Sequence, residues 1–505
     1  MSERRWAIAT PHTAATAAGV TAFEAGGNAV DAALAAACAI AVVYPHMNAV
    51  GGDVMALVHD GAGHAVNGSG RAPAGIRPGP VPLRGVGAIT VPGAARAWQT
   101  LADRWGSLPL SRALLGAAAL AHDGVPVAPS LARTMADCAD VIRADAGLSG
   151  VFAPGGRLLA EGETLVQERL AATLERLAGR GAGDLYRGET GAMLVAGLRD
   201  LGAPLAEVDL EAHRTDVSPA LRHAVGDDVY VTMGPNSQGY VLPQIMDVAG
   251  RTRLRDPFGH GAPLLAAIFT GAAADRDRHL ADPAAMRVGV EELLSAAHLE
   301  ELAAAAVGPT GVPTAWPRAT GDTIALVTAD ADLRVSLIQS IYYGFGSGVL
   351  EPRTGILLHN RGACFSADPA SPNAPAPGKR PLHTLMPLMA ERAGRVRWVA
   401  GTMGGHAQPQ IHAQLLLRRQ AGASAQAAVA APRFIVGEEV PGLAISVEEG
   451  FDSAWSAFTD WGAAPVAIPA GSGLAGHSHA IAVAADGSFD AGSDPRADGA
   501  AATGD

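Results

Sequence analysis

The sequence predicts an α+β fold, in which apolar helices and short β-branched strands are mixed along one chain. The clearest strand signal is the apolar, β-branched run 323–328, which a polar turn at 329–332 separates from a second apolar run at 334–341. Two such runs around a short acidic turn are typical of a β-hairpin. In the first half of the chain, several segments have apolar residues at helical spacing and are expected to form a helical lobe. These segments are 110–122, 165–179 and 192–201.

The size and composition of the chain fit a large folded body. The chain has 505 residues, enough for two or three average domains. Hydrophobic residues make up 49% of it, which is ample for a large core. The mixture of strands and helices does not by itself distinguish one arrangement of these elements from another.

Helices are predicted near the N-terminal end. Residues 13–25 and 30–43 have helical patterns, and the Gly26-Gly27 pair between them ends the first helix. The apolar run 32–44 is too short to cross a bilayer, so it is predicted to be a buried helix. The strands expected next are 55–58 and 88–91.

The second half of the chain continues the mixed pattern. Beyond the hairpin, a strand is expected at 395–401 and a helix at 411–420. Residues 366–380 are dense in Pro and Ala and are predicted to form a loop. The tail from residue 486 onward is rich in Gly, Ala and Asp, and we expect it to be disordered.

The segment 343–349, directly after the hairpin, has glycine at alternate positions. Glycines let the chain pass close to another group and leave backbone N–H groups uncovered. Such a segment is suited to form the wall of a pocket. Thr323, at the start of the hairpin, is on its own the kind of residue that a turn carries.

Recognisable motifs stand at intervals along the chain. Around the hairpin they are Gly321–Thr323, Val335–Ser340, Gly344–Val349 and Gly355–Asn360. On either side they are Ala25–Ala33, Pro45-His46 with Gly51-Gly52, Asp184–Gly188, Pro235–Gly239, Arg380–Leu382 and Met403–Gly405. In type and order, these motifs resemble those of the γ-glutamyltransferase (γ-glutamyltranspeptidase) family of N-terminal nucleophile hydrolases. The resemblance covers nearly the whole chain.

This resemblance implies a four-layer αββα sandwich with Thr323 at the end of a central strand. It also implies that the chain is made as an inactive precursor that cleaves itself between Asp322 and Thr323. The products would be a large subunit, residues 1–322, which includes the helical lobe, and a small subunit, residues 323–505. Both subunits would belong to one folded body.

The implied chemistry explains why a threonine must come first in the small subunit. A hydroxyl is a poor nucleophile at neutral pH, but a freed α-amine, with a pKa near roughly 8, can take its proton as an adjacent base. In the family, acyl transfer runs through an ester on this threonine. Thr323 would therefore supply both the attacking group and the base.

Further positions match catalytic residues of the family. Gly404-Gly405 stand where backbone N–H groups hold the tetrahedral oxyanion, and such donors contribute roughly 3 kcal/mol apiece to transition-state stabilisation. Ser340 matches a second hydroxyl, which orients the amine of the nucleophile. From the residues alone, the glycine pair is a turn after a strand and Ser340 is an ordinary strand serine.

The positions expected to recognise the substrate depart from the family pattern. Ser69 stands where the transferases carry the arginine that pairs with the α-carboxylate of the glutamyl group, and Arg71 lies two positions away. Arg71 has the planar fork that binds anions, although an arginine near a loop is commonly a surface residue. Ala363-Cys364 replace the acidic pair that holds the α-ammonium.

Other recognition positions differ as well. His383-Thr384 replace a serine pair that binds the same carboxylate, and Tyr342 stands where many members carry Asn. Because missing polar partners discriminate strongly between substrates, we expect an amide donor without a free α-amino group. Its carboxylate or other acyl chain could meet Arg71, Arg361 or His383. This pattern is similar to that of the side branch with oxamate amidohydrolase and certain cephalosporin acylases.

Other functions stay open at this point. One is a true γ-glutamyltransferase or γ-glutamyl (glutathione) hydrolase whose recognition residues have moved. Another is a relative that no longer cleaves itself and serves as a binding protein. The retained Thr323, Ser340 and Gly404-Gly405 favour the enzyme. Hydrolysis or transfer depends on whether water or an amine reaches the acyl-threonine first.

Charge and cysteine content restrict the partners. The net charge is −12 and the basic residues are scattered, which argues against nucleic acid. Cys38, Cys138 and Cys364 have no CxxC spacing, so neither a disulfide framework nor a zinc site is indicated, and no cofactor is expected. Cys364 is a less favoured nucleophile because Thr323 already explains the motifs.

The simplest interpretation is a cytoplasmic enzyme with a small-molecule amide as its substrate and no membrane partner. The sequence leaves homo-oligomer formation open.

Overall fold

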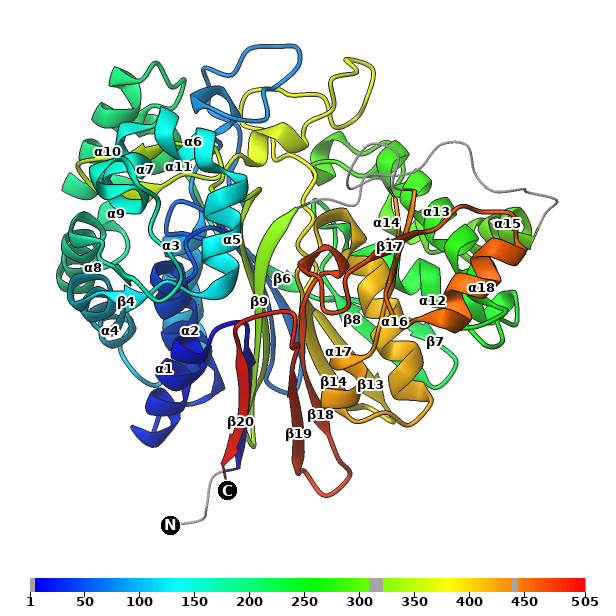
Figure 1. The fold of residues 1–505 in the computed structure, drawn as a ribbon. Helices are drawn as coiled ribbons and strands as arrows, with labels where there is room; N and C mark the ends of the chain where they lie inside the picture. The colour runs from blue at the N-terminus through cyan, green and yellow to red at the C-terminus, as the bar shows by residue number, and fades with distance from the viewer. Residues whose placement is uncertain (1–4, 308–320, 438–443, 505) are drawn as a thin grey trace.

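The computed structural model describes residues 5–307, 321–437 and 444–504. Two antiparallel sheets pack face to face at the centre of this part of the chain, and helices cover the outer face of each (Figure 1). In spatial order, the first sheet is β20 (Ala500–Gly504), β1 (Trp6–Thr10), β9 (Asp322–Ala329), β10 (Arg334–Tyr342), β2 (Asp53–His59), β3 (Gly63–Asn67) and β6 (Asp216–Pro219). The second is β19 (Phe489–Ser493), β18 (Ser478–Val483), β14 (Arg395–Thr402), β13 (Leu388–Arg392), β8 (Asp228–Thr232) and β7 (Leu221–Val225).

Most of the helices of the first half of the chain lie on the side of the first sheet (Figure 1). They are α1 (Thr13–Glu24), α2 (Ala29–Val43), α3 (Ala94–Trp105), α4 (Leu110–Asp123), α5 (Pro129–Asp137), α6 (Ala139–Ala144), α7 (Ala146–Phe152), α8 (Glu168–Arg180), α9 (Asp184–Arg187), α10 (Glu189–Asp200) and α11 (Glu207–Ala212). On the side of the second sheet are α12 (Val241–Arg251), α13 (Ala262–His279), α14 (Val290–Leu293), α15 (Ala296–Val307), α16 (Gln408–Gln420), α17 (Ala425–Ala430) and α18 (Asp452–Asp460).

Short strands pair outside the two central sheets. They are β4 (Val125–Pro126) with β5 (Thr164–Leu165), β11 (Leu350–Glu351) with β12 (Ile356–Leu357), and β15 (Phe434–Val436) with β16 (Ile445–Glu448) and β17 (Val466–Ile468).

Both faces of β9 are buried, which explains its continuous apolar run. Successive side chains of a strand point to opposite faces. Ile324 and Leu326 pack with the helices that cover the first sheet, whereas Ala325 and Val327 pack between the two sheets. Thr323 continues the second set, so its side chain points into the space between the sheets.

The same alternation places the serines of β10 between the sheets. Ile338 belongs to the apolar cluster that fills this space. Ser336 is two residues earlier, and its hydroxyl donates a hydrogen bond of 2.7 Å to the carbonyl of Ala400 on β14. Ser340, two residues after Ile338, therefore lies on the face of the sheet that carries Thr323.

The predicted hairpin and N-terminal helices are confirmed. β9 and β10 pair in antiparallel register around a turn at 330–333. Asn28 caps α2, because its side chain accepts hydrogen bonds from the N–H groups of Val30 and Asp31 while the Asp31 carboxylate accepts one from Asn28. The predicted helices of the lobe are present as α4, α8 and α10, with ends shifted by a few residues.

Two expectations are wrong. Residues 88–91 form no strand: a 3₁₀ turn ends at Ala88, and the backbone beyond it bonds to a loop, with the N–H of Val91 donating to the carbonyl of Arg71. The tail is not disordered where it forms β19 and β20. β20 pairs with β1, and Gly504 lies close against the ring of Trp6, so pairing with the start of the chain orders this small-residue segment.

Within residues 5–307, 321–437 and 444–504, no helix has both the length and the apolar character needed to cross a membrane.

Candidate active site

Thr323 lies at the start of β9, with its hydroxyl against the peptide bond that precedes it. Its Oγ1 is 2.6 Å from the carbonyl oxygen of Asp322 and 3.0 Å from the Oγ of Ser340. The Oγ of Ser340 is 2.9 Å from the same carbonyl oxygen. These oxygens form a triangle beside the Asp322–Thr323 bond. Thr323 is only 1% exposed, so its side chain is shielded from solvent.

The hydroxyl of Ser340 has a defined direction. Its oxygen accepts one hydrogen bond from the N–H of Tyr342, at 2.8 Å, and another from Nη2 of Arg361, at 3.1 Å. A hydroxyl group has one proton to donate. Ser340 donates its proton to the carbonyl oxygen of Asp322, at 2.9 Å. Ser340 thereby polarises the carbonyl next to Thr323.

The strand that carries Ser340 is irregular at this point. The register between β9 and β10 shifts between Gln339 and Tyr342, and Tyr342 lies opposite Asp322. Tyr342 has a φ of 81°, which is unfavourable for a residue with a large side chain. Such strain persists only where surrounding contacts hold it, and it is typical of functional sites.

Arg361 brings a fully buried cation to Ser340. Its guanidinium carbon lies 4.5 Å from the centre of the Tyr342 ring, in a cation–π contact. Besides its bond to Ser340, the guanidinium makes two contacts through Nη1. This nitrogen is 3.2 Å from Oγ1 of Thr384 and 3.5 Å from Sγ of Cys364.

Asp53, on β2, is the buried carboxylate that faces this cation. Its Oδ2 is 3.6 Å from Nε of Arg361, 3.1 Å from Nε2 of His383 and 3.2 Å from Nδ1 of His359. Its Oδ1 accepts a hydrogen bond of 3.0 Å from the N–H of Gly70. All four side chains of this charged cluster are 0% exposed. A buried cation needs such a partner, and Asp53 supplies it.

The protonation states of the cluster follow from its geometry. Burial alone would raise the pKa of the Asp53 carboxyl, but its interaction with His359 and its hydrogen bond with His383 hold this pKa below its usual range. Burial and the Arg361 cation lower the pKa of His383 to about 3. At neutral pH Asp53 is therefore ionised and balances Arg361, while His383 is neutral.

Gly404 and Gly405 form the turn between β14 and α16. Their φ values of 139° and 51° are ones that residues with side chains rarely adopt. A Cβ added to Gly321 would lie 2.9 Å from the Cα of Gly405, so the turn touches the chain just before Asp322. No hydrogen bond runs from the backbone N–H of either turn glycine to another described residue.

Gln238 and Arg276 hold this turn in place through hydrogen bonds to backbone carbonyls. Nε2 of Gln238 donates to the carbonyls of Gly405, at 2.9 Å, and of Thr384, at 2.7 Å. Its Oε1 accepts a hydrogen bond from Nη1 of Arg276, which also donates to the carbonyl of His406, both at 3.0 Å. The glycine turn and the Thr384 segment therefore keep a fixed relation to each other.

Most of the residues predicted from the motifs meet around the Asp322–Thr323 bond. They are Thr323, Ser340, Tyr342, Arg361, His383, Thr384 and the Gly404-Gly405 turn.

Arg71 is the exception. Its guanidinium contacts Asp282 at 3.3 Å and the carbonyl of Gly378 at 3.0 Å, and its side chain is 45% exposed. In this structure Asp282 pairs with the charge of Arg71, and a contact between Arg71 and the substrate stays a prediction.

Sequence reasoning missed other members of the site: Asp53, His359, Gln238 and Arg276. A signal for Asp53 was present, because a carboxylate directly before the apolar run 54–58 has no solvent-facing place in a buried strand. His359 and Gln238 lie inside the motifs around residues 355–360 and 235–239. No local pattern indicates Arg276.

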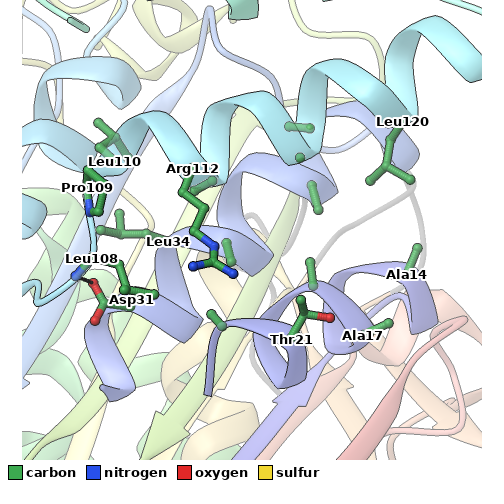
Figure 2. Close-up of a pocket in the computed structure, with 17 residues that line it drawn as sticks. Ala14, Ala17, Thr21, Asp31, Leu34, Leu108, Pro109, Leu110, Arg112 and Leu120 are labelled. Atoms are coloured by element: carbon green, nitrogen blue, oxygen red, sulfur yellow. Dashed lines mark hydrogen bonds between the residues drawn. The ribbon is translucent and has the colours of Figure 1, made fainter. Parts of the chain in front are cut away.

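A cavity of about 430 Å³ lies elsewhere, between α1, α2 and α4 (Figure 2). Small and apolar side chains line most of it, and Thr323 and its partners are not among them. The carboxylate of Asp31 at its edge is engaged by the N–H groups of Ser107 and Leu108. This cavity is therefore separate from the chemistry around Thr323.

Comparison with known proteins decides the family. A sequence model of the gamma-glutamyltranspeptidase family matches residues 15–504. The chain belongs to this family. As a member of the γ-glutamyltranspeptidase family, it is an enzyme of the N-terminal nucleophile hydrolase type, as the motifs predicted.

Similar proteins align with this γ-glutamyltranspeptidase-family chain over nearly all of its length. It is 35% identical to the oxamate amidohydrolase proenzyme of Klebsiella pneumoniae, with 97% of each chain covered. It is 34% identical to the glutathione hydrolase-like YwrD proenzyme of Bacillus subtilis, covering 98% of this chain and 97% of that protein.

A solved structure supports the fold. The crystal structure of cephalosporin acylase from Bacillus halodurans matches with a TM-score of 0.88 and 32% identity, covering 99% of this chain and 96% of that one. The predicted mixed fold of helices and antiparallel sheets is confirmed.

Proposed function

We propose that this chain is an amidohydrolase that cuts its own Asp322–Thr323 bond and then uses Thr323 as its nucleophile. The observation that best supports this proposal is the triangle of oxygens formed by Thr323, Ser340 and the Asp322 carbonyl. The two central sheets and their covering helices would be the four-layer αββα sandwich of the N-terminal nucleophile hydrolases. Similar proteins named as proenzymes agree with a precursor that becomes a large and a small subunit.

In the first step, Oγ1 of Thr323 attacks the carbonyl carbon of Asp322 and gives up its proton. Ser340 donates a hydrogen bond to the carbonyl oxygen, where negative charge develops. The C–N bond then breaks, the nitrogen of Thr323 takes the proton, and the Asp322 acyl group forms an ester with Oγ1. Water hydrolyses this ester, which leaves a carboxylate on Asp322 and a free amine and hydroxyl on Thr323.

In the second step, the freed amine serves as the base. Its pKa near roughly 8 suits it to take the proton of its own hydroxyl. The hydroxyl attacks the carbonyl of an amide substrate, and the N–H groups of Gly404 and Gly405 hold the oxyanion. The amine of the substrate leaves with a proton, and water releases the acyl group from Thr323.

The acyl group of the substrate should carry a carboxylate and lack an α-ammonium. The guanidinium of Arg361 bonds to Ser340 and Thr384, and a carboxylate that replaces one of these hydroxyls would meet its planar fork. The carboxylate at this end of the site, Asp53, is already engaged by Arg361 and the histidines. Positions 363 and 364 are Ala and Cys, so they offer no anion to an ammonium group.

The names of similar proteins support two substrate candidates. Oxamate, an amide with an adjacent carboxylate, fits the charge of the site, and its hydrolase is 35% identical to this chain. The glutathione hydrolase-like protein of Bacillus subtilis supports a γ-glutamyl amide as the second candidate.

The test compares amides that differ in charge. Purified enzyme is given oxamate, its neutral counterpart oxamide, or a γ-glutamyl anilide, and released ammonia or aniline is measured beside the Thr323→Ala variant. We expect turnover of oxamate to exceed that of oxamide by roughly tenfold or more, because the carboxylate gains a charged hydrogen bond. Faster release from the anilide would favour the second candidate. A self-cleaved enzyme that turns over none of these amides would contradict the proposed substrate class.

A further inference from the structure

Both the carbonyl oxygen and the side-chain carboxyl of Asp322, the residue before Thr323, contact other groups. On one side, its carbonyl oxygen meets the hydroxyls of Thr323 and Ser340. Because neighbouring side chains of a strand point to opposite faces, the Asp322 side chain lies on the other side. There its carboxyl lies against the backbone of Gly344, whose N–H group lowers the pKa of this carboxyl.

The carboxyl of Asp322 lies in a tight site formed by α5 and the segment 343–349. A Cβ added to Gly344 would be 3.2 Å from Oδ2 of Asp322, 3.0 Å from Cγ2 of Thr134 and 3.5 Å from Sγ of Cys138. A side chain at position 344 would crowd the Asp322 carboxyl and Thr134. Gly344 therefore allows its own N–H to approach the carboxyl.

Arg84 fixes the segment that presents this N–H. Its Nη1 donates hydrogen bonds to the carbonyls of Gly344 and Gly346. The charged groups around the Asp322 carboxyl are Arg84 and Asp137, with the thiol of Cys138 nearby. Burial, the largest effect, and Asp137 raise the pKa of Asp322, Arg84 and the Gly344 N–H lower it, and the result is about 6.

We propose that Asp322 is a positioning residue for self-cleavage: its carboxyl, anchored by Gly344, fixes the scissile carbonyl against the hydroxyls of Thr323 and Ser340. This inference rests on the proposed self-cleavage. Reaction rates depend steeply on the placement of the attacked carbonyl, so an anchor on the side chain of the same residue has a large effect. The anchor also gives a reason for glycine at position 344.

The experiment follows cleavage of the full chain made by cell-free translation, using gels and intact mass over time. Asp322→Ala removes the anchor and should slow cleavage by roughly tenfold or more. Asp322→Asn keeps an oxygen for the Gly344 N–H and should stay within about threefold of the natural chain. Asp137→Asn, the matched control, removes the neighbouring carboxylate without touching the anchor and should leave the rate near that of the natural chain.

A pH profile separates positioning from a general effect on folding. Between pH 5 and 8, the cleavage rate of the natural chain should change slope near pH 6, where Asp322 ionises, and Asp322→Asn should lack that change. Gly344→Ala keeps Asp322 but crowds its carboxyl, and it should also slow cleavage. The double variant Asp322→Asn/Thr323→Ala must stay whole, since cleavage there would arise from the asparagine side chain.

The outcomes distinguish this inference from the function on which it rests. If Asp322→Ala cleaves like the natural chain at every pH while Thr323→Ala stays whole, the positioning role is overturned and self-cleavage stands. If the natural chain does not cleave, both proposals fall. Slow cleavage of Asp322→Ala and Gly344→Ala, with near-normal cleavage of Asp322→Asn, supports the anchor.

Discussion

Nε2 of His383 lies 3.1 Å from Oδ2 of Asp53, a contact that joins the segments before and after Thr323. The same carboxylate oxygen faces Arg361, whose guanidinium reaches Ser340. A buried carboxylate on β2 thus organises the groups that surround the Asp322 carbonyl.

The first prediction concerns this carboxylate. Asp53→Asn should lower the free energy of unfolding by about 3–5 kcal/mol, because it leaves the buried Arg361 without its anion. Urea unfolding measures the change, in a Thr323→Ala background that keeps the chain whole. Asp140→Asn, which changes a fully exposed carboxylate, should leave the free energy unchanged. Equal stability of the Asp53→Asn protein and its parent would show that Asp53 does not balance Arg361.

The second prediction concerns the aromatic ring of Tyr342, which contacts Arg361. Tyr342→Phe keeps the aromatic face that lies 4.5 Å from the guanidinium carbon, whereas Tyr342→Leu removes it. The free energy of unfolding of the Leu variant should be lower than that of the Phe variant by about 1–2 kcal/mol, the range of a desolvated cation–π contact. Urea unfolding of both variants tests this, and equal values would argue against a stabilising contact.

The third prediction concerns Ser340 in self-cleavage. Ser340→Ala removes the hydrogen bond to the carbonyl of Asp322 and should slow cleavage by about 10²–10³. Ser340→Thr keeps a hydroxyl and should restore part of the rate. Ser336→Ala, on the same strand, removes a hydroxyl that bonds to Ala400 instead and should have little effect. The half-time of fragment appearance is the measurement, and a normal half-time for Ser340→Ala would exclude this role.

The fourth prediction concerns pH and buried histidines. Burial lowers the pKa of His412 to about 3 and that of His477 to about 4, from an ordinary value of 6.5. Below pH 6.5 the unfolded chain binds protons that the folded chain does not. The free energy of unfolding should therefore fall as the pH drops from about 6.5 towards 4.

Urea unfolding of the Thr323→Ala chain at several pH values tests this fall. His412→Gln should reduce the slope by about one proton per molecule, whereas His122→Gln, at a side chain 71% exposed, should leave it unchanged. A free energy of unfolding that does not change between pH 6.5 and 4 would contradict the prediction.

Local patterns predicted the hairpin and the first helices, because their signals lie within short segments. The pairing of β20 with β1 could not be predicted in this way. Trp6 stands opposite Gly504, so a strand at one end of the chain is ordered by a strand at the other. Composition alone suggested disorder, since small residues are common to flexible tails and to edge strands covered by a neighbour.

For the candidate site, too, the sequence indicated some of the residues and not others. Thr323, Ser340 and Arg361 belong to motifs around the hairpin, and the structure brings them into contact. Asp53 is visible as a charge beside an apolar run, but its partners are far away in the sequence and are chosen by the packing of strands. The direction of Arg71 depends on Asp282, to which no pattern in the sequence links it.

The most direct test of the account is the intact mass and amino-terminal sequence of the purified protein, with Thr323→Ala beside it. The account predicts two fragments from the natural chain, the smaller one beginning at Thr323, and a single chain from the variant. A natural chain that stays whole at neutral pH would contradict self-cleavage and would favour a binding protein.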